Sequence, residues 1–377
     1  MVASPQALGG QQQAHGNSSL LTGASLKATC TSMPCTQVLK LVRPQLHSFS
    51  FIWSGMEAAL ACLADLASAS LASLAPEDFE GVPDPGILLG ELARCPQLAA
   101  LKFAGALSCS SLGNPMTIRL PHLRQLTSLE LSGFKFKVKS LLSGLPNLTA
   151  LSIPWTALWG PLAPLSGLTA LRSLSIAAHD GGKVVDFPPS LPGLQSLCVR
   201  GFHAFKVLTL DGLTSLSALT LEDMDNLVVL SLKDVQGLQD VTLAVYQLNN
   251  LCNNLYNASS PLTRLVLRYP DGSNSVGLPM ALTCFTLLQS LKISFENPVG
   301  DGGVLLPRDF GRLSCLTSLD LGGCDLDELH VSVLTDLLRL KLLDVSRSQT
   351  DRWKRKHFVE LSDALPDLHL ITRKGRF

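Results

Sequence analysis

The sequence predicts an α/β solenoid, in which short parallel strands form one curved sheet and short helices, turns and extended segments cover its convex side. Two observations predict this fold class. The motif L-x-x-L-x-L, with apolar variants, recurs fourteen times between Leu46 and Leu365, at intervals of 22 to 28 residues. A fixed period of this length is the signature of a repeat array, here of about 14 repeats. Hydrophobic residues make up 46% of the 377 residues and charged residues only 16%, which is sufficient for a continuous core.

The motif itself predicts a strand that is buried on one side. Alternate side chains of x-L-x-L-x point to opposite faces, which is the period of β-structure. In LTSLDL, residues 316–321, Leu319 and Leu321 are therefore expected in the interior and Asp320 on the concave surface. One repeat cannot bury its leucines alone, so the repeats are expected to stack in parallel, with strands about 4.8 Å apart.

The strong and weak copies of the motif together define the expected strands. Weak copies open the array, and two half-period copies, FKVLTL at 205–210 and LVVLSL at 227–232, predict extended convex segments between 205 and 243. The full copies begin at Leu46, Leu71, Leu98, Leu126, Leu148, Leu171, Leu194, Leu216, Leu238, Leu262, Leu288, Leu316, Leu340 and Leu365.

These residues resemble the leucine-rich-repeat family over about residues 36–371. The segment LPRDFGRLSCLTSLDLGGC, residues 306–324, is similar to a plant-type repeat, with Cys324 where the family usually has Asn or Cys. The segment LLGELARCPQLAALKF, residues 88–103, resembles the cysteine-containing, ribonuclease-inhibitor-like repeats. The resemblance implies a mixed array with strands on the concave face.

The chain departs from the family at the position of its buried Asn, eight residues after the first Leu. Only Thr156, Cys324 and Ser348 are small polar or thiol side chains that could plausibly substitute for the amide there. The amide ladder that satisfies the turns of the family is therefore expected to be mostly missing. The ten residues at this position are Phe134, Thr156, His179, Phe202, Met224, Tyr246, Pro270, Glu296, Cys324 and Ser348.

Three domains are expected along the chain: a disordered or targeting arm over 1–34, the solenoid over 35–350, and a capping segment over 351–377. Residues 1–56 contain no Asp or Glu and many Ser, Thr and Ala, which is typical of a plastid transit peptide or of a flexible polar arm. The basic run DRWKRKHF, residues 351–358, predicts a polar helix whose apolar side covers the last repeat. A nuclear signal or a phosphate contact is the alternative for this run.

Composition and motifs exclude several classes of function. Lys+Arg and Asp+Glu balance at 30 each, so no global field favours nucleic acid. The sequence holds no H-E-x-x-H, G-x-S-x-G or phosphate-binding loop, and its ten cysteines form no C-x-x-C pair. The window 56–75 carries Glu57 and Asp65 and makes a poor membrane span. We therefore expect no enzyme, metal, cofactor, small-molecule substrate, nucleic-acid partner or membrane span.

The candidate partner-binding residues are Arg264, Arg268, Tyr269, Lys292 and Phe295. They occupy outward or terminal positions of two neighbouring strands, whereas the outward positions of the preceding repeats are mostly Ser, Ala and Thr. Arginine and aromatic residues are enriched at binding hot spots, so these five predict a basic and aromatic patch on the concave face.

A structural alternative exists for one of these residues. Lys292 and Asp320 occupy the same position in successive repeats, and opposite charges on neighbouring strands form pairs. On this interpretation the lysine is an intramolecular ion-pair partner and not a binding residue.

The resemblance implies a non-enzymatic, intracellular scaffold or adaptor that binds another protein through its concave face. Family members include adaptors, inhibitors, cytoskeletal and ciliary or axonemal components, and ligase receptors. The expected location is the cytoplasm, in association with the cytoskeleton or a cilium, with the plastid as the alternative from the acid-free N-terminus. The alternative function is the substrate-recognition subunit of a ubiquitin ligase that lacks a recognisable F-box.

Overall fold

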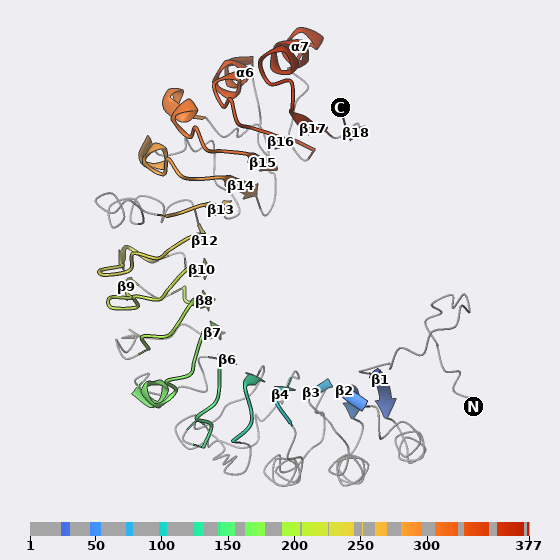
Figure 1. The fold of residues 1–377 in the computed structure, drawn as a ribbon, viewed down its shortest axis with the longest axis vertical. Helices are drawn as coiled ribbons and strands as arrows, with labels where there is room; N and C mark the ends of the chain where they lie inside the picture. Colours follow the sequence, from blue (N-terminus) through green and yellow to red (C-terminus); the bar gives the residue numbers. More distant parts are fainter. Residues whose placement is uncertain are drawn as a thin grey trace, which may run out of the picture.

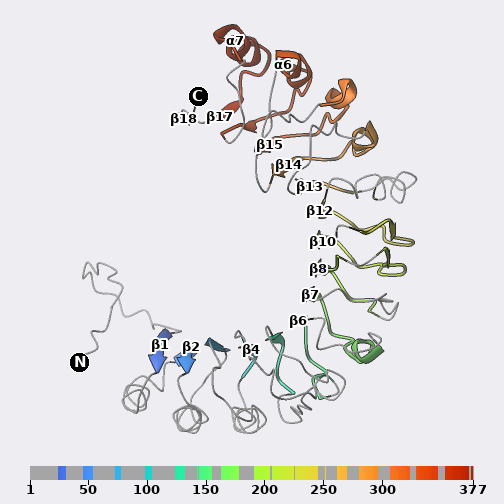
Figure 2. The same cartoon turned by 180° about the vertical axis from the view of Figure 1, so that it is seen from behind.

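The computed structural model shows an open arc with strands along its inner side (Figure 1). The strands β1 and β18 lie at the two ends of this arc, and the view from behind shows the same arrangement (Figure 2). The structure describes residues 24–30, 46–53, 73–77, 98–103, 124–131, 142, 144–154, 163–177, 191–203, 206–224, 226–244, 251, 261–269, 280–295, 306–322, 328–346, 353–372 and 375–376.

One sheet of sixteen strands runs through the described residues, and its neighbours pair in parallel except for β17 and β18, which are antiparallel. The strands follow the chain, so each repeat lies beside the next one. They are β1 (Ala24–Cys30), β2 (Leu46–Trp53), β3 (Ser73–Glu77), β4 (Ala100–Phe103), β5 (Ser128–Leu131), β6 (Ala150–Pro154), β7 (Ser173–Ala177), β8 (Ser196–Arg200), β10 (Ala218–Glu222), β12 (Asp240–Ala244), β13 (Arg264–Tyr269), β14 (Ser290–Phe295), β15 (Ser318–Gly322), β16 (Leu342–Asp344), β17 (His369–Thr372) and β18 (Gly375–Arg376).

Every predicted motif coincides with one of these strands, from β2 to β17. The predicted curved parallel sheet of a leucine-rich-repeat solenoid is thus confirmed. The sheet also contains β1, which lies in the predicted 1–34 arm, and β17 and β18, which lie in the predicted capping segment. The sheet therefore extends past both predicted ends of the solenoid, while the division into three domains stays a prediction.

The interior is a continuous ladder of leucines. Strands pair so that equivalent positions of successive repeats are neighbours: Leu197 lies beside Leu219, and Leu219 beside Val241. Each of these side chains is at most 1% exposed. Leu319 and Leu321 are fully buried and Asp320 is not, as the alternation predicts. A fully buried leucine contributes about 1.5–3 kcal/mol, so the stability of the array is collective.

A second ladder, made of hydroxyls and backbone groups, crosses the repeats at the start of each strand. The carbonyl of Thr127 accepts hydrogen bonds from the backbone N–H groups of Thr149 (2.8 Å) and Ala150 (2.9 Å), and from Oγ1 of Thr149 (3.0 Å). Equivalent hydroxyl bonds link one repeat to the preceding one from Thr127, Ser217, Thr263 and Thr317. These bonds satisfy backbone groups where strands begin, as buried polar groups require.

The family's Asn position is apolar in the two repeats where its side chain is described. Phe202 is 2% exposed and Met224 is fully buried, so both fill the interior in place of an amide. Two amide side chains link successive repeats from a different position, one residue before the first Leu of a full or half-period copy of the motif. Nδ2 of Asn147 donates to the carbonyl of Arg124 at 2.8 Å, and Nδ2 of Asn226 donates to the carbonyl of His203. Thr156, Cys324 and Ser348 lie outside the described residues.

The convex side changes character along the chain (Figure 1). Near the middle it carries two short strands, β9 (Val207–Thr209) and β11 (Val229–Ser231), which pair in parallel as a second sheet. Oδ1 of Asp211 joins the two by accepting from Oγ of Ser231 at 2.6 Å and from the N–H of Lys233 at 2.9 Å. The extended convex segments predicted between 205 and 243 are thus confirmed.

Helical segments cover the convex side elsewhere. These are the 3-10 helices η4 (Ala163–Gly167), η6 (Met280–Cys284) and η7 (Arg308–Arg312), followed by the α-helices α6 (Glu328–Thr335) and α7 (Arg355–Ala364). α7 is the helix predicted from the basic run, and it buries Leu361 and Leu365. It lies on the convex side against α6 and leads into β17 (Figure 1), so β17 and β18 form the end of the sheet.

Candidate partner-binding surface

The concave face is uncharged in its middle and charged toward the C-terminal half. On β6 and β7 the described outward residues are Ala and Ser. From the end of β8 to β15 the outward residues include a set that we call the charged strip. It consists of Arg200, Glu222, Asp240, Arg264, Arg268, Lys292 and Asp320.

The predicted residue Arg264 lies on this strip and is already paired. Its Nη1 atom is 2.8 Å from Oδ2 of Asp240 on the neighbouring strand β12, and the two side chains are 53% and 42% exposed. The Cα atoms of the two residues are partners in the sheet. A pair so exposed contributes about 0–1 kcal/mol to stability, but it holds the guanidinium in one orientation.

Lys292 also forms an ion pair, as the alternative interpretation of its sequence position predicted. Nζ of Lys292 is 2.6 Å from Oδ2 of Asp320 on β15, and the other carboxylate oxygen of Asp320 accepts from the N–H of Gly322 at 3.0 Å. Asp320 is consequently half-buried although it faces the concave side. The ion pair does not exclude a binding role, since the lysine side chain remains 45% exposed.

Tyr269 and Phe295 end the adjacent strands β13 and β14, and their Cα atoms are partners in the sheet. The backbone therefore brings the two predicted aromatic positions together. Their side chains lie outside what the structure describes, so the predicted contact between the rings stays a prediction.

Arg268 makes a longer connection than sequence reasoning foresaw. Its Nη2 atom lies 2.9 Å from Oε1 of Glu222 on β10, although β12 runs between β10 and β13. Nε of Arg200, on β8, lies 3.1 Å from Oε2 of the same glutamate. Glu222 therefore bridges two arginines that come from opposite sides, and its side chain is only 13% exposed.

Arg200 and Glu222 were not among the predicted site residues. The signal was present in the sequence, because Arg200, Glu222, Ala244 and Arg268 occupy the same position in four successive repeats. That periodicity predicts neighbours on adjacent strands. It does not predict a pair formed across an intervening strand, which is what Arg268 makes.

Cys198 completes the local network around Arg200. Nε of Arg200 donates to Sγ of Cys198 at 3.1 Å as well as to Glu222. The interaction with Cys198 is the main cause that raises the pKa of Arg200 above its usual value, and the negative charges of Glu222 and Asp223 act in the same direction, against the effect of burial. Arg200 is therefore a cation throughout the physiological pH range.

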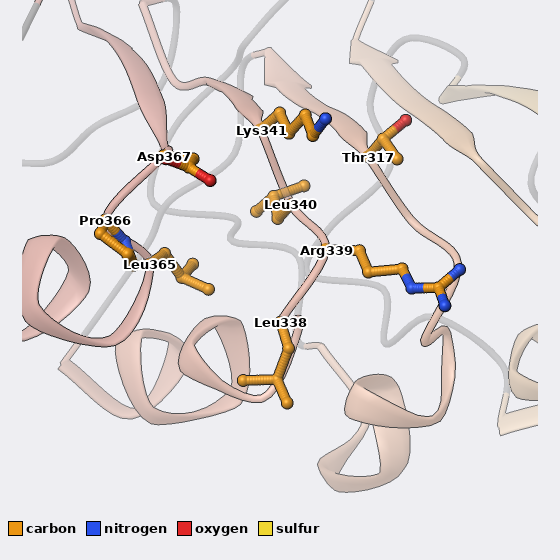
Figure 3. Close-up of a pocket in the computed structure, with 8 residues that line it drawn as sticks. All are labelled: Thr317, Leu338, Arg339, Leu340, Lys341, Leu365, Pro366 and Asp367. Carbon is orange, nitrogen blue, oxygen red and sulfur yellow. The ribbon is translucent and has the colours of Figure 1, made fainter.

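A shallow cavity of about 420 Å³ lies at the strand-start edge of the last repeats (Figure 3). Leu338, which is 79% exposed, and Leu365 contribute apolar surface, while Arg339 and Lys341 extend from the segment that leads into β16 (Figure 3). The cavity is not on the concave charged strip. Among the described residues, no three His, Cys, Asp or Glu side chains converge as metal ligands would.

No protein-family model matches the sequence, and no curated protein matches it. Three solved structures are similar in fold. An internalin (InlF) from Listeria monocytogenes has 19% identity and a TM-score of 0.45, with 82% of each chain covered. A leucine-rich-repeat protein from Leptospira interrogans has 18% identity and a TM-score of 0.40, with 86% of this chain and 90% of that chain covered. The Drosophila Toll–Spatzle complex has 14% identity and a TM-score of 0.49, with 93% of this chain and 50% of that chain covered.

The class of protein follows from the repeat motif and the sheet that it builds: the chain is a leucine-rich-repeat solenoid. Within the described part of the chain, no helix combines the length and apolar character that a membrane crossing requires.

Proposed function

We propose that the protein is a non-enzymatic scaffold or adaptor that binds another protein through its concave face. The observation that carries this proposal is the charged strip, a series of half-exposed charged side chains oriented by ion pairs on one continuous sheet. Recognition surfaces are commonly carried by rigid scaffolds of this kind. Ion pairs that orient their charges before binding reduce the ordering entropy lost on association.

The proposed contact residues are Arg264, Arg268, Tyr269, Lys292 and Phe295. Each of the three cations forms an ion pair in the free protein. Complementary charges on a partner are therefore expected to contribute more to the specificity of binding than to its affinity. Tyr269 and Phe295 end β13 and β14, and Tyr269 directly follows Arg268 in the chain. Aromatic residues are among the types that dominate binding energy at interfaces.

Two finer assignments belong to the same proposal and rest on the sequence alone. The repeats at 306–324 and 88–103 are of the plant type and the ribonuclease-inhibitor-like type, respectively. The protein resides in the cytoplasm, in association with the cytoskeleton or a cilium.

Partner capture tests the proposal directly. The tagged protein is used to isolate partners, which mass spectrometry identifies, and the affinity of each purified partner is then measured. Replacing Arg264 and Arg268 together by Gln should weaken binding at least tenfold, about 1.4 kcal/mol. Gln keeps a polar, uncharged side chain and places no new negative charge beside Asp240 and Glu222.

Lys102→Gln is the matched control for this experiment. Lys102 is also a half-exposed cation in an inter-strand ion pair, with Glu130 at 2.7 Å, but it lies on β4. The control should bind as the wild type does. Full binding by a folded double variant would place recognition elsewhere, and recovery of cullin-type subunits would support the ubiquitin-ligase alternative.

A further inference from the structure

One glutamate of the charged strip contacts two arginines, whereas the other described ion pairs of the strip join one cation to one anion. We call Arg200, Glu222 and Arg268 the arginine clamp. Arg268 Nη2 and Arg200 Nε contact the two different oxygens of Glu222, at 2.9 and 3.1 Å. Both guanidinium groups therefore lie on one nearly buried carboxylate.

A small residue makes this geometry possible. Ala244 is the Cα partner of Arg268 on β12, the strand that separates Arg268 from Glu222. Two strand spacings are about 10 Å, a span that the long arginine and the glutamate can close only if the side chain between them is short. Alanine at 244 leaves the path over β12 open.

The three side chains of the clamp carry two positive charges and one negative charge, a surplus of one positive charge among them, and the charge of Asp223, which is not part of the clamp, also acts on Arg200. The pairs Lys102–Glu130, Arg264–Asp240 and Lys292–Asp320 each join one cation to one anion. Glu222 alone, among the described ion pairs of the concave face, is shared by two cations. The arginine side chains are 53% and 42% exposed whereas the carboxylate is 13% exposed, so the surplus charge is presented to solvent.

The guanidinium groups keep donors for a second acceptor. Each has five N–H donors, and the clamp uses Nε of Arg200 and Nη2 of Arg268 for Glu222. With respect to the described residues, nitrogens on both arginines remain for an oxygen that approaches from the concave side. Arginine binds carboxylates with paired N–H···O bonds, which are stronger and more directional than neutral hydrogen bonds.

We propose that the arginine clamp binds the carboxylate of an Asp or Glu side chain in an extended, acidic segment of the partner. The inference rests on the proposed function and names the chemistry of its partner. A carboxylate neutralises the single surplus charge. A dianionic phosphate would leave excess negative charge beside Glu222, so a carboxylate fits the clamp better than a phosphorylated side chain does.

Peptide binding tests the proposal with the full-length protein. The probe is a fluorescein-labelled peptide of alternating Ser and Glu, compared by anisotropy with two peptides in which Gln or phosphoserine replaces each Glu. The wild type should bind the Glu peptide at least tenfold more tightly than the Gln peptide and more tightly than the phosphoserine peptide. A preference for phosphoserine, or absence of any difference between Glu and Gln, overturns the proposal.

Two substitutions locate the effect at the clamp. Arg268→Gln removes the surplus charge and should weaken binding of the Glu peptide at least tenfold, whereas Lys102→Gln removes the same charge from a one-to-one ion pair on β4 and should change binding less than threefold. Ala244→Leu obstructs the path of Arg268 to Glu222 without changing charge, and should also weaken binding. Equal losses for Arg268→Gln and Lys102→Gln would show general electrostatic attraction only and would overturn the proposal.

Cys198 gives an independent readout of position, because its sulfur is 3.1 Å from Nε of Arg200. A bromoacetylated Ser/Glu peptide should alkylate Cys198 faster than its Gln counterpart does, as shown by mass mapping of the labelled protein. Equal rates of Cys198 alkylation by the two peptides would overturn the clamp proposal. If the wild type shows no preference between the Glu and Gln peptides and Arg268→Gln still captures the partner, the clamp proposal fails and the scaffold function stands. If no partner depends on the concave face, the scaffold function fails.

Discussion

The middle of the molecule and its C-terminal part have the same interior but different surfaces. Around β8 and β10 the repeats are 22 residues long, and the convex side is the extended ribbon of β9 and β11. Around β15 to β17 they are 24 or 25 residues long, and the convex side carries α6 and α7. In both parts the leucines of the motif are buried, except Leu368 in the last repeat, which is partly buried. The interior is therefore independent of the convex structure that covers it.

Repeat length explains the difference on the convex side. Consecutive repeats of 22 residues place Val207 beside Val229, Leu208 beside Leu230 and Ser231 beside Thr209, so the convex segments pair in register as a second parallel sheet. An α-helix rises only 1.5 Å per residue, against about 3.3 Å for a strand. A helical convex segment therefore needs more residues to span the same width, which the longer repeats supply.

Truncating the interior should have the largest effect and the same effect in both parts. Leu219→Ala on β10 and Leu319→Ala on β15 should each destabilise the fold by about 2–5 kcal/mol, because each removes a fully buried side chain from the ladder. Chemical denaturation measures both. Leu338→Ala is the control, since a side chain 79% exposed should change stability by less than about 0.5 kcal/mol. A clearly smaller loss for Leu219 would mean that the ribbon tolerates cavities that the helical part does not.

Packing between convex helices should be the next most sensitive feature. A Cβ atom on Gly311 of η7 would lie 2.6 Å from Cβ of Asp336, which follows α6. Gly311→Ala should therefore destabilise the C-terminal part by about 1–3 kcal/mol, measured as a lower melting temperature. Gly167→Ala, also in a 3-10 helix but with nothing within 4 Å of its Cβ position, should be neutral. Adding Asp336→Gly to Gly311→Ala should restore part of the loss, and no recovery would contradict the proposed clash.

Single substitutions of ion-paired residues on the concave face should change the free energy of unfolding less. Asp320→Ala removes the partner of Lys292 and the acceptor of the Gly322 N–H, and Asp320 is only 26% exposed. We expect a loss of about 1 kcal/mol. Glu130→Ala breaks a pair in which both side chains are at least 40% exposed, so its loss should stay below about 0.5 kcal/mol. Urea denaturation at low and at high salt compares the two, and equal losses would show that the half-buried position of Asp320 has no energetic consequence.

Relief of backbone strain in the ribbon should have the smallest effect. Asp234 has a φ of 65°, and the equivalent residue one repeat earlier is Gly212, with a φ of 79°. Asp234→Gly should stabilise the protein by no more than about 1 kcal/mol, because glycine occupies this region without the steric penalty but loses more entropy on folding. A precise thermal-denaturation comparison tests the sign, and a clear loss of stability would indicate that the Asp234 side chain makes a needed contact.

The sequence alone determined the strands of the repeats from β2 to β17, their parallel direction and which of their side chains are interior. This is possible because the strand period is local: L-x-L places Leu319 and Leu321 on one face and Asp320 on the other in any extended chain. The half-period copies at 205 and 227 likewise predicted β9 and β11. The strand β1 was missed because its sequence, ASLKATC, holds a single leucine and lacks the leading residues of the motif.

Tertiary structure alone decided how the surface charges are distributed. The pairs Arg264–Asp240 and Lys292–Asp320 follow from equivalent positions on adjacent strands, and the second of them was anticipated from the sequence. The contact of Arg268 with Glu222 was not, since it depends on the short side chain of Ala244 and on the rotamers of two long side chains across a curved sheet. Those variables exist only after the repeats have stacked, because no single repeat contains both partners.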